Sequence, residues 1–283
     1  MRLRVLTLAI SLVTSNPVFA QWMGKQTGCY ADSIAANPNR PTVANPADIT
    51  QYGVLELEYG WDRFWPDAHT TQTSAGGLLK FGLLCDLEMR WNTTSFISVT
   101  DPSGNSRGIG DNWLGPQLRL YHQTKHIPSI AISYAAKIPS ADSSKDLGSG
   151  KVDHAFSILA SKDVSGFHFD FNATEFLDGR ANVFGFDKNQ LLTLSTSHPI
   201  HGPLAITAEF YGSTELNRST PGYASSLWAL SYAVTPRLVI DSGFEAGITS
   251  GGPHRHAFFG ATYSIANLYP GWKQRRRAKP NAP

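Results

Sequence analysis

The sequence predicts an all-β protein, a transmembrane antiparallel up-and-down β-barrel of about twelve strands. Three observations favour this fold class. Residues 51–266 contain repeated segments in which apolar and polar side chains alternate with the two-residue period of a β-strand. The connections between these segments alternate between long and short. The first twenty residues resemble an export signal.

The export signal comes first along the chain. Arg2 and Arg4 form a basic start, an apolar run follows from Val5 to Val13, and the signal ends on Ala20. We therefore read residues 1–20 as a signal peptide and expect cleavage after Ala20. The apolar run is too short for a membrane-spanning helix, and no later apolar run reaches the length of about 18 residues that a spanning helix needs.

Residues 21–50 are rich in Pro, Asn, Ala and Asp and have no period. We expect an irregular N-terminal arm that either lies in the periplasm or folds into the barrel as a plug. Cys29 lies in this arm, and Cys85 lies at a tight turn on the periplasmic side. A disulfide between them could tether the arm to the base of the barrel, and two free thiols are the alternative.

Twelve strands account for the period-two segments of residues 51–266. In "VLELEYGWD", for example, Leu55 and Leu57 lie on one face, and Glu56 and Glu58 lie on the other. A helix would need apolar residues three and four positions apart, which these segments lack. The predicted strands cover residues 52–62, 71–83, 85–98, 110–122, 128–138, 153–163, 166–176, 188–198, 203–213, 222–233, 236–248 and 255–266.

Long connections such as residues 139–151 alternate strictly with short ones such as Val164-Ser165 and Thr235-Pro236. Outer-membrane barrels have this pattern, with short periplasmic turns and long external loops. A soluble periplasmic β-fold, with the apolar faces as its core, is the alternative. Aromatic residues near strand ends fit the interfacial girdles of a barrel: Tyr59, Trp61, Trp65, Trp91, Tyr134, Trp228, Tyr232 and Tyr263.

In a barrel the apolar faces meet lipid and the charged faces meet the lumen. The lumen charges have two readings, an ion network that fills a narrow barrel or a wet path that favours cations and neutral solutes. Nine acids stand against four bases among the candidate lumen-lining residues, which are Glu56, Glu58, Asp62, Lys80, Asp86, Glu88, Arg90, Arg119, Lys137, Asp170, Glu209, Asp241 and Glu245.

The charge balance gives no case for nucleic-acid binding. Without residues 1–20 the chain has 22 basic and 22 acidic residues, and five of the bases lie in the last eleven positions. The remaining body is therefore mildly acidic. We read residues 267–283 as a basic C-terminal tail, either solvated or in contact with anionic lipid.

A catalytic or metal site has little support. The chain lacks Gly-x-Ser-x-Gly, His-Glu-x-x-His and Cys-x-x-Cys, and its nine His residues are scattered. His69, His254 and His256 could gather at the rim, but solvated loop histidines are the simpler interpretation. We expect no enzyme, no cofactor and no metal.

The stretch "GIGDNWLGPQLRLY" (residues 108–121) has the spaced glycines of a phosphate-binding loop. No Lys-Ser/Thr follows and no helix opens, so that reading fails. From Asp111 the period is two, which predicts a strand whose apolar face includes Pro116. Because proline has no N–H, we expect a bulge or a missing hydrogen bond at that position.

Residues 108–120 resemble the Gly-x-Gly-Asp-x-x-Leu-Gly-x-x-x-Arg-Leu segment of the outer-membrane proteins named for the MetA pathway of phenol degradation. Residues 53–61, 127–139, 148–157, 238–249 and 258–265 resemble further segments of that family, and the similarity covers about residues 40–266. The resemblance implies a bacterial outer-membrane barrel described as a transporter. The chain departs from the outer-membrane pattern by adding the tail after its last strand.

The expected function is passage of a small solute, hydrophobic or aromatic in one version of the hypothesis. A closed barrel with a structural or adhesive role is the first alternative, and a barrel enzyme acting on lipid or peptide is the second. The expected partners are outer-membrane lipid and a small-molecule solute.

Overall fold

The computed structural model describes residues 33–180, 183–216, 221–249, 251, 253 and 255–269. No helix in these ranges is long and apolar enough to span a membrane. They contain one short 3₁₀ helix, Ser143–Lys145, and the strands β1 (Val54–Trp65), β2 (Thr71–Gly82), β3 (Leu87–Asp101), β4 (Gly104–Gly108), β5 (Asn112–Tyr121), β6 (Ser129–Ile138), β7 (His154–Val164), β8 (Phe167–Gly179), β9 (Phe186–His201), β10 (Leu204–Ser213), β11 (Tyr223–Thr235), β12 (Leu238–Gly247) and β13 (Arg255–Asn267).

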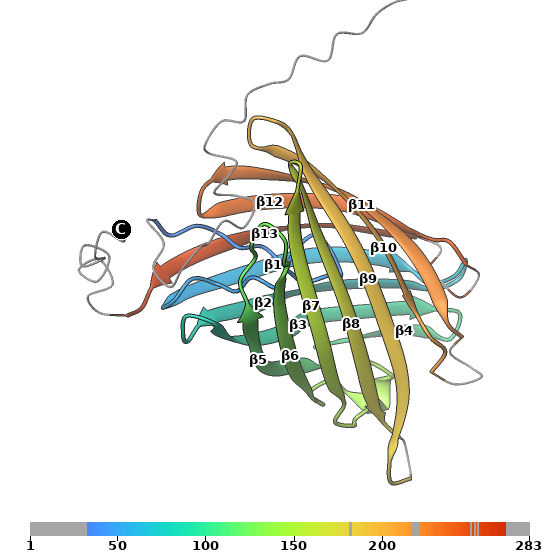
Figure 1. Cartoon of the computed structure of the whole chain (residues 1–283). Coiled ribbons are helices and arrows are strands. Elements are labelled where there is room, and N and C mark those ends of the chain that lie inside the picture. The colour runs from blue at the N-terminus through green and yellow to red at the C-terminus, as the bar shows by residue number, and fades with distance from the viewer. Residues whose placement is uncertain are drawn as a thin grey trace, which may run out of the picture.

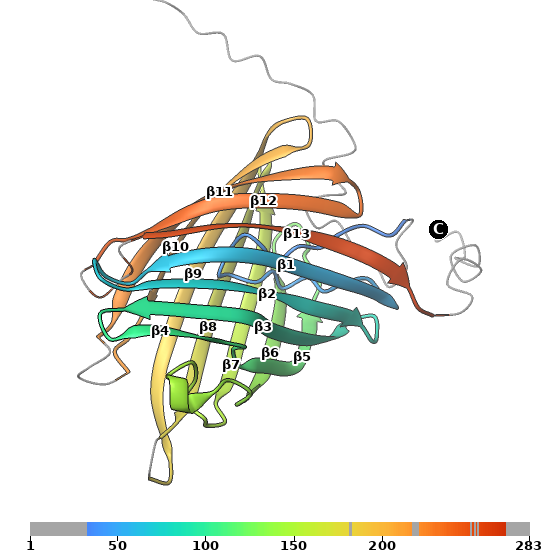
Figure 2. The same ribbon diagram turned by 180° about the vertical axis from the view of Figure 1, so that it is seen from behind.

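The strands form one closed antiparallel barrel (Figures 1 and 2). The seam is closed because β1 pairs with β13 as well as with β2, and β2 pairs with β3. β4 pairs only with the far part of β3, whose near part pairs with β5. The wall therefore has twelve strands within the described residues, and the predicted fold class is confirmed.

The third predicted connection differs from the expectation. Residues 99–109 were expected to be a long loop, but β3 continues to Asp101 and turns back into β4. The Asp101 carboxylate accepts hydrogen bonds from the backbone N–H groups of Ser103 and Gly104, at 2.7 and 3.1 Å. Gly104 has φ +148°, which favours glycine. This tight turn therefore lets β3 and β4 form a two-stranded extension beyond the part of β3 that belongs to the barrel wall.

Polar and apolar side chains are distributed in the opposite way to a soluble protein. On β1, Leu57 and Tyr59 are exposed, while their neighbours Glu56 and Glu58 are buried inside. The same alternation recurs along the other strands, and the buried apolar clusters of the described residues are small. An outer surface of this kind requires lipid around it, which excludes the soluble alternative.

Pro116 interrupts the ladder between β5 and β6 without a bulge. Leu114 pairs with Ala136 and Gln117 pairs with Ser133, with no pair between β5 and β6 at the two residues between them. The register is the same on both sides of this gap, and the only shift between the two strands lies between Arg119 and Tyr121. The missing donor of proline explains the gap, so of the two expected alternatives the structure has the missing hydrogen bond and not the bulge.

Candidate functional site

The segment before β1 runs as an irregular coil inside the barrel (Figures 1 and 2). We call residues 33–50 the arm. A coil has no regular backbone hydrogen bonds of its own, so its buried N–H groups need acceptors from the surrounding wall. Four inward carboxylates supply them: Glu56 accepts from Asn37, Glu58 from Asn39 and Arg40, Glu209 from Val43 and Ala44, and Glu88 from Thr50, at 2.6–2.9 Å.

Lys80 lies at the centre of a buried ion cluster between the arm and the wall. Its Nζ is 2.7 Å from Glu56 Oε1 and 2.6 Å from Glu58 Oε1, and none of the three side chains is more than 2% exposed. It also donates to the Asn37 carbonyl and to Asn39 Oδ1. The same cation therefore joins two wall carboxylates to the arm, an arrangement that depends on every member being paired.

Two arginines extend the network between arm and wall. Arg119 on β5 contacts Asp86 and the arm residue Asp48, each at 2.9 Å. Arg40 of the arm contacts Asp241 on β12, also at 2.9 Å. Both pairs link segments that are distant in sequence, and they fix the arm against opposite sides of the wall.

The other candidate lumen residues are also partnered. Arg90 donates to Gln117 and Asn45, Lys137 contacts Asp111 and Asp153, and Glu245 accepts from Tyr211 at 2.5 Å. Asp62 accepts from Ser74 at 2.7 Å. Asp170 faces His168, whose other ring nitrogen faces Asp163; when both carboxylates are ionised, hydrogen bonds at both nitrogens need the charged imidazolium.

Twelve of the thirteen candidate residues lie on strands with their side chains on the inner face. Asp86 instead lies in the turn before β3, with its side chain 41% exposed. The candidate list was drawn from acidic and basic side chains alone, so it omitted His168, Tyr211 and His256. The alternation of side chains along a strand places all three on the inner face. The arm partners Arg40 and Asp48 had no comparable signal, because the arm has no period.

A cavity of about 540 Å³ occupies the half of the lumen nearest the long loops. We call it the upper cavity. The arm forms its floor through Asn39, Arg40, Thr42 and Asn45, and eight strands supply its walls, from Gly60 on β1 round to Thr193 on β9. Most of the lining is Gly, Ala, Ser, Thr or Asn, so the space results from small side chains on the inner face.

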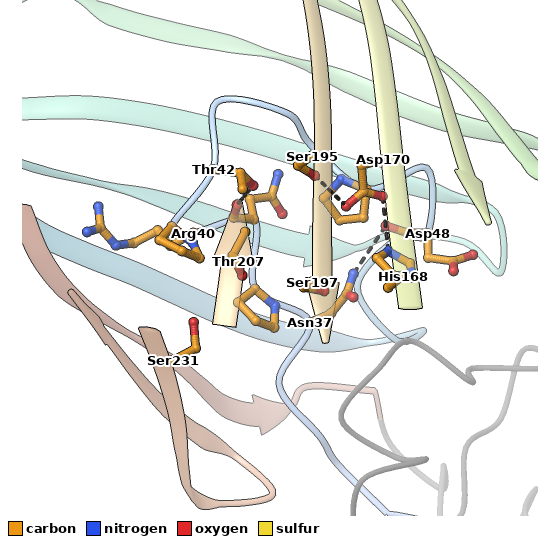
Figure 3. A pocket seen from close by; sticks show the side chains of 14 residues that line it. Asn37, Arg40, Thr42, Asp48, His168, Asp170, Ser195, Ser197, Thr207 and Ser231 are labelled. Carbon is orange, nitrogen blue, oxygen red and sulfur yellow. Dashed lines mark hydrogen bonds and ion pairs between the residues drawn. The ribbon is translucent and has the colours of Figure 1, made fainter. Parts of the chain in front are cut away.

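A smaller pocket of about 80 Å³ lies on the other side of the arm, towards the short turns (Figure 3). We call it the lower pocket. Arm residues face His168 and Asp170 on β8 and the hydroxyl residues Ser197, Thr207 and Ser231 on β9 to β11. In Figure 3 the Arg40 guanidinium points away from the pocket. Asn39, Arg40 and Thr42 line both spaces, so this bend of the arm separates them.

The described residues contain no group of three or more His, Cys, Asp or Glu side chains that could hold a metal. His256 contacts Glu245 at 2.9 Å. The backbone N–H groups of His69 and Thr70 donate to the loop residue Asp67 and lower the pKa of its carboxyl group. His254, the third member of the hypothetical rim cluster, lies outside the described residues.

The other sequence predictions about ends and cysteines stay predictions. Cys85 lies in the turn between β2 and β3, and Cys29 lies outside the described residues. The disulfide between them stays a prediction, because its Cys29 end lies outside the described residues. The signal peptide and the basic tail, apart from residues 267–269, also lie outside the described residues.

A closed barrel with an apolar exterior, a charged interior and a coil held inside it defines a class of membrane protein. The chain belongs to the family described as "Putative MetA-pathway of phenol degradation", whose model matches residues 36–265. The resemblance noted in the sequence is thus confirmed. Family and fold together make the chain a barrel of the bacterial outer membrane.

Solved structures share the fold at low sequence identity. An outer membrane channel from Pseudomonas putida F1 has a TM-score of 0.62 and 11% identity, over 83% of this chain and 99% of that one. The NanC porin has a TM-score of 0.50 and 10% identity, over 75% of this chain and 100% of that one. Comparison with curated protein sequences gives no match.

Proposed function

We propose that the barrel lets small solutes cross the outer membrane through its lumen, along the side of the arm that faces β8 to β11. One observation carries this proposal: the upper cavity and the lower pocket lie on opposite sides of the arm and share Asn39, Arg40 and Thr42. A small movement of this bend would join the two spaces into one path.

The opposite side of the lumen is blocked by paired charges. Lys80, Glu56 and Glu58 are fully or almost fully buried against the arm. Separating them would leave uncompensated charges in the interior, which is costly. The wall near β9 to β11 instead offers Ser197, Thr207 and Ser231, whose hydroxyl groups carry no net charge. A route on this side passes the His168–Asp170 and Arg40–Asp241 pairs but leaves the pairs of Lys80 with Glu56 and Glu58 in place.

The proposed solutes are neutral molecules or small cations. Glu56, Glu58, Glu88 and Glu209 are already neutralised in part by N–H groups of the arm. Asp62 borders the upper cavity, and the basic side chain within 4.0 Å of it among the described residues is His256, whose Nε2 is 3.8 Å away. The remaining acidic character disfavours anions. That the same fold occurs in a protein named as an outer membrane channel supports passage rather than catalysis.

Conductance of the refolded chain in planar bilayers tests the proposal. We expect a cation-preferring current, and an anion-selective current would contradict it. Absence of current, also after removal of the arm, would favour the closed structural barrel. Accumulation of altered lipid or peptide in expressing cells would instead favour the enzyme.

The route has its own test with a matched pair of variants. Thr207→Cys places a thiol in the lower pocket, whereas Thr262→Cys places one on the inner face of β13, where the side chain is completely buried. A charged thiol reagent should reduce the current through T207C and leave T262C and the parent chain unchanged. The reverse order of sensitivity would overturn the route.

A further inference from the structure

The outer face of the wall changes from apolar to polar near the long loops, on five neighbouring strands. β13, β1, β2, β3 and β4 lie side by side there (Figure 2). One row across the first four of these strands is apolar and consists of Phe259, Trp61, Ala75 and Phe96. The rings of Trp61 and Phe259 stack with their centroids 5.5 Å apart. Aromatic side chains of this kind mark the boundary between acyl chains and headgroups.

Two residues closer to the loops, the outward side chains are polar. The next outward row from β1 to β4 consists of Arg63, Thr73, Ser98 and Arg107. Directly opposed residues share one face of a sheet, and Asp62, the neighbour of Arg63, borders the upper cavity. The row therefore points away from the lumen, at the level where lipid headgroups lie.

Two arginines on this face lie against the same aromatic ring. Trp65 on β1 is paired with Arg255 on β13, and Arg63 lies two residues before Trp65. The Cζ atoms of Arg63 and Arg255 are 5.4 and 5.7 Å from the centroid of the Trp65 ring. Both arginines are exposed. The ring holds the two guanidinium groups on one patch of the surface, while their N–H groups can still donate to an anion.

The chain supplies no anion to these cations. In the part of the chain that the structure describes, no carboxylate lies within 4.0 Å of Arg63, Arg107 or Arg255. The acids of the adjoining loops, Asp67 and Asp101, accept hydrogen bonds from backbone N–H groups of their own turns. The other described arginines are all partnered by carboxylates or backbone carbonyls, and they are Arg40, Arg90, Arg119, Arg180 and Arg237. Three cations on one outer face are therefore available to an external anion.

We propose that this outer face binds a phosphorylated glycolipid of the outer leaflet, with the chemistry of lipid A. Arginine binds phosphate through paired N–H donors, so the phosphate groups lie at Arg63, Arg107 and Arg255. The sugar lies over the hydroxyl groups of Thr73 and Ser98, and the acyl chains pack on the apolar row below. Long loops lie outside in barrels of this class, which places this end of the wall in the outer leaflet. The site is on the exterior and does not depend on passage through the lumen.

Native mass spectrometry of the refolded full-length barrel in detergent tests the site, with lipid A as the probe. We expect lipid A to bind, and dephosphorylated lipid A to bind at least about tenfold more weakly. Arg63→Ala and Arg255→Ala should each weaken the binding of lipid A by about fivefold, since each removes one cation from the headgroup level. Lys188→Ala is the matched control: it removes one exposed outward cation near the long loops, but on β9, and should bind like the parent.

Four results would overturn the proposal. Equal binding of dephosphorylated lipid A would remove the phosphate, and equal binding of phosphatidylglycerol would remove the sugar. Complete displacement of lipid A by inorganic phosphate would make free phosphate the ligand. Equal weakening in K188A and R63A would reduce the effect to general positive charge.

Two controls accompany these variants. Heat-modified migration on a gel shows that each barrel has formed. Bilayer conductance should stay at the parent level in R63A and R255A, because neither side chain faces the lumen. The lipid site and the proposed passage therefore fail independently.

Discussion

Lys80 is the residue on which most buried contacts between the arm and β1 depend. Its ammonium group is the only cation within 4.0 Å of Glu56 or Glu58 among the described residues. The pair of carboxylates would otherwise face each other inside the barrel beside an arm that supplies only N–H groups. A single side chain therefore neutralises both buried carboxylates.

Lys80→Met should lower the free energy of unfolding by about 3–5 kcal/mol, because it leaves buried carboxylates without their cation. Urea denaturation of the barrel in detergent, followed by tryptophan fluorescence, measures the loss. Lys125→Met changes an exposed lysine in the turn before β6 and should stay within about 0.5 kcal/mol of the parent. Equal stability of the two variants would show that the buried cluster contributes nothing.

At the scale of elements, the strands were predictable and the arm was not. Period two alone locates Glu56, Glu209 and their neighbours on the inner face, since parity in a strand is fixed by pleating. The contacts of Arg40 with Asp241 depend on the path of a coil with no period. Likewise, β4 exists because Asp101 and Gly104 form a tight turn that the sequence reading treated as loop.

Glu209 offers a way to loosen one end of the arm. Its two oxygens accept from Val43 at 2.8 Å and Ala44 at 2.6 Å, and Glu209→Gln removes the charge and one acceptor. We expect the fraction of barrels with a released arm to rise by about tenfold, seen as more frequent or larger openings in bilayer recordings.

Glu245→Gln is the control for this change. Glu245 also faces the lumen, on β12, but its partners are Tyr211 and His256 rather than the arm. Its openings should match those of the parent chain. If both variants open equally, the effect comes from lumen charge in general and not from release of the arm.

At the scale of the whole molecule, closure through the β1–β13 pair makes the barrel one cooperative unit. The folded chain should fractionate with membranes and migrate differently on a gel before and after heating, because the closed ladder stays folded in the gel detergent until the sample is heated. Recovery of a soluble protein with no shift would contradict the barrel. The long strands β8 and β9, which continue past their neighbours (Figure 1), should remain part of this unit.

The exposed apolar side chains of the wall have a thermodynamic consequence. In water, closing the barrel would leave Leu57, Phe171 and Phe244 still 38%, 44% and 57% exposed, so much of the hydrophobic term is gained only when lipid surrounds the wall. Folding and insertion are therefore a single linked equilibrium. The measured stability of this chain is a joint property of its sequence and of the thickness and composition of the bilayer that receives it.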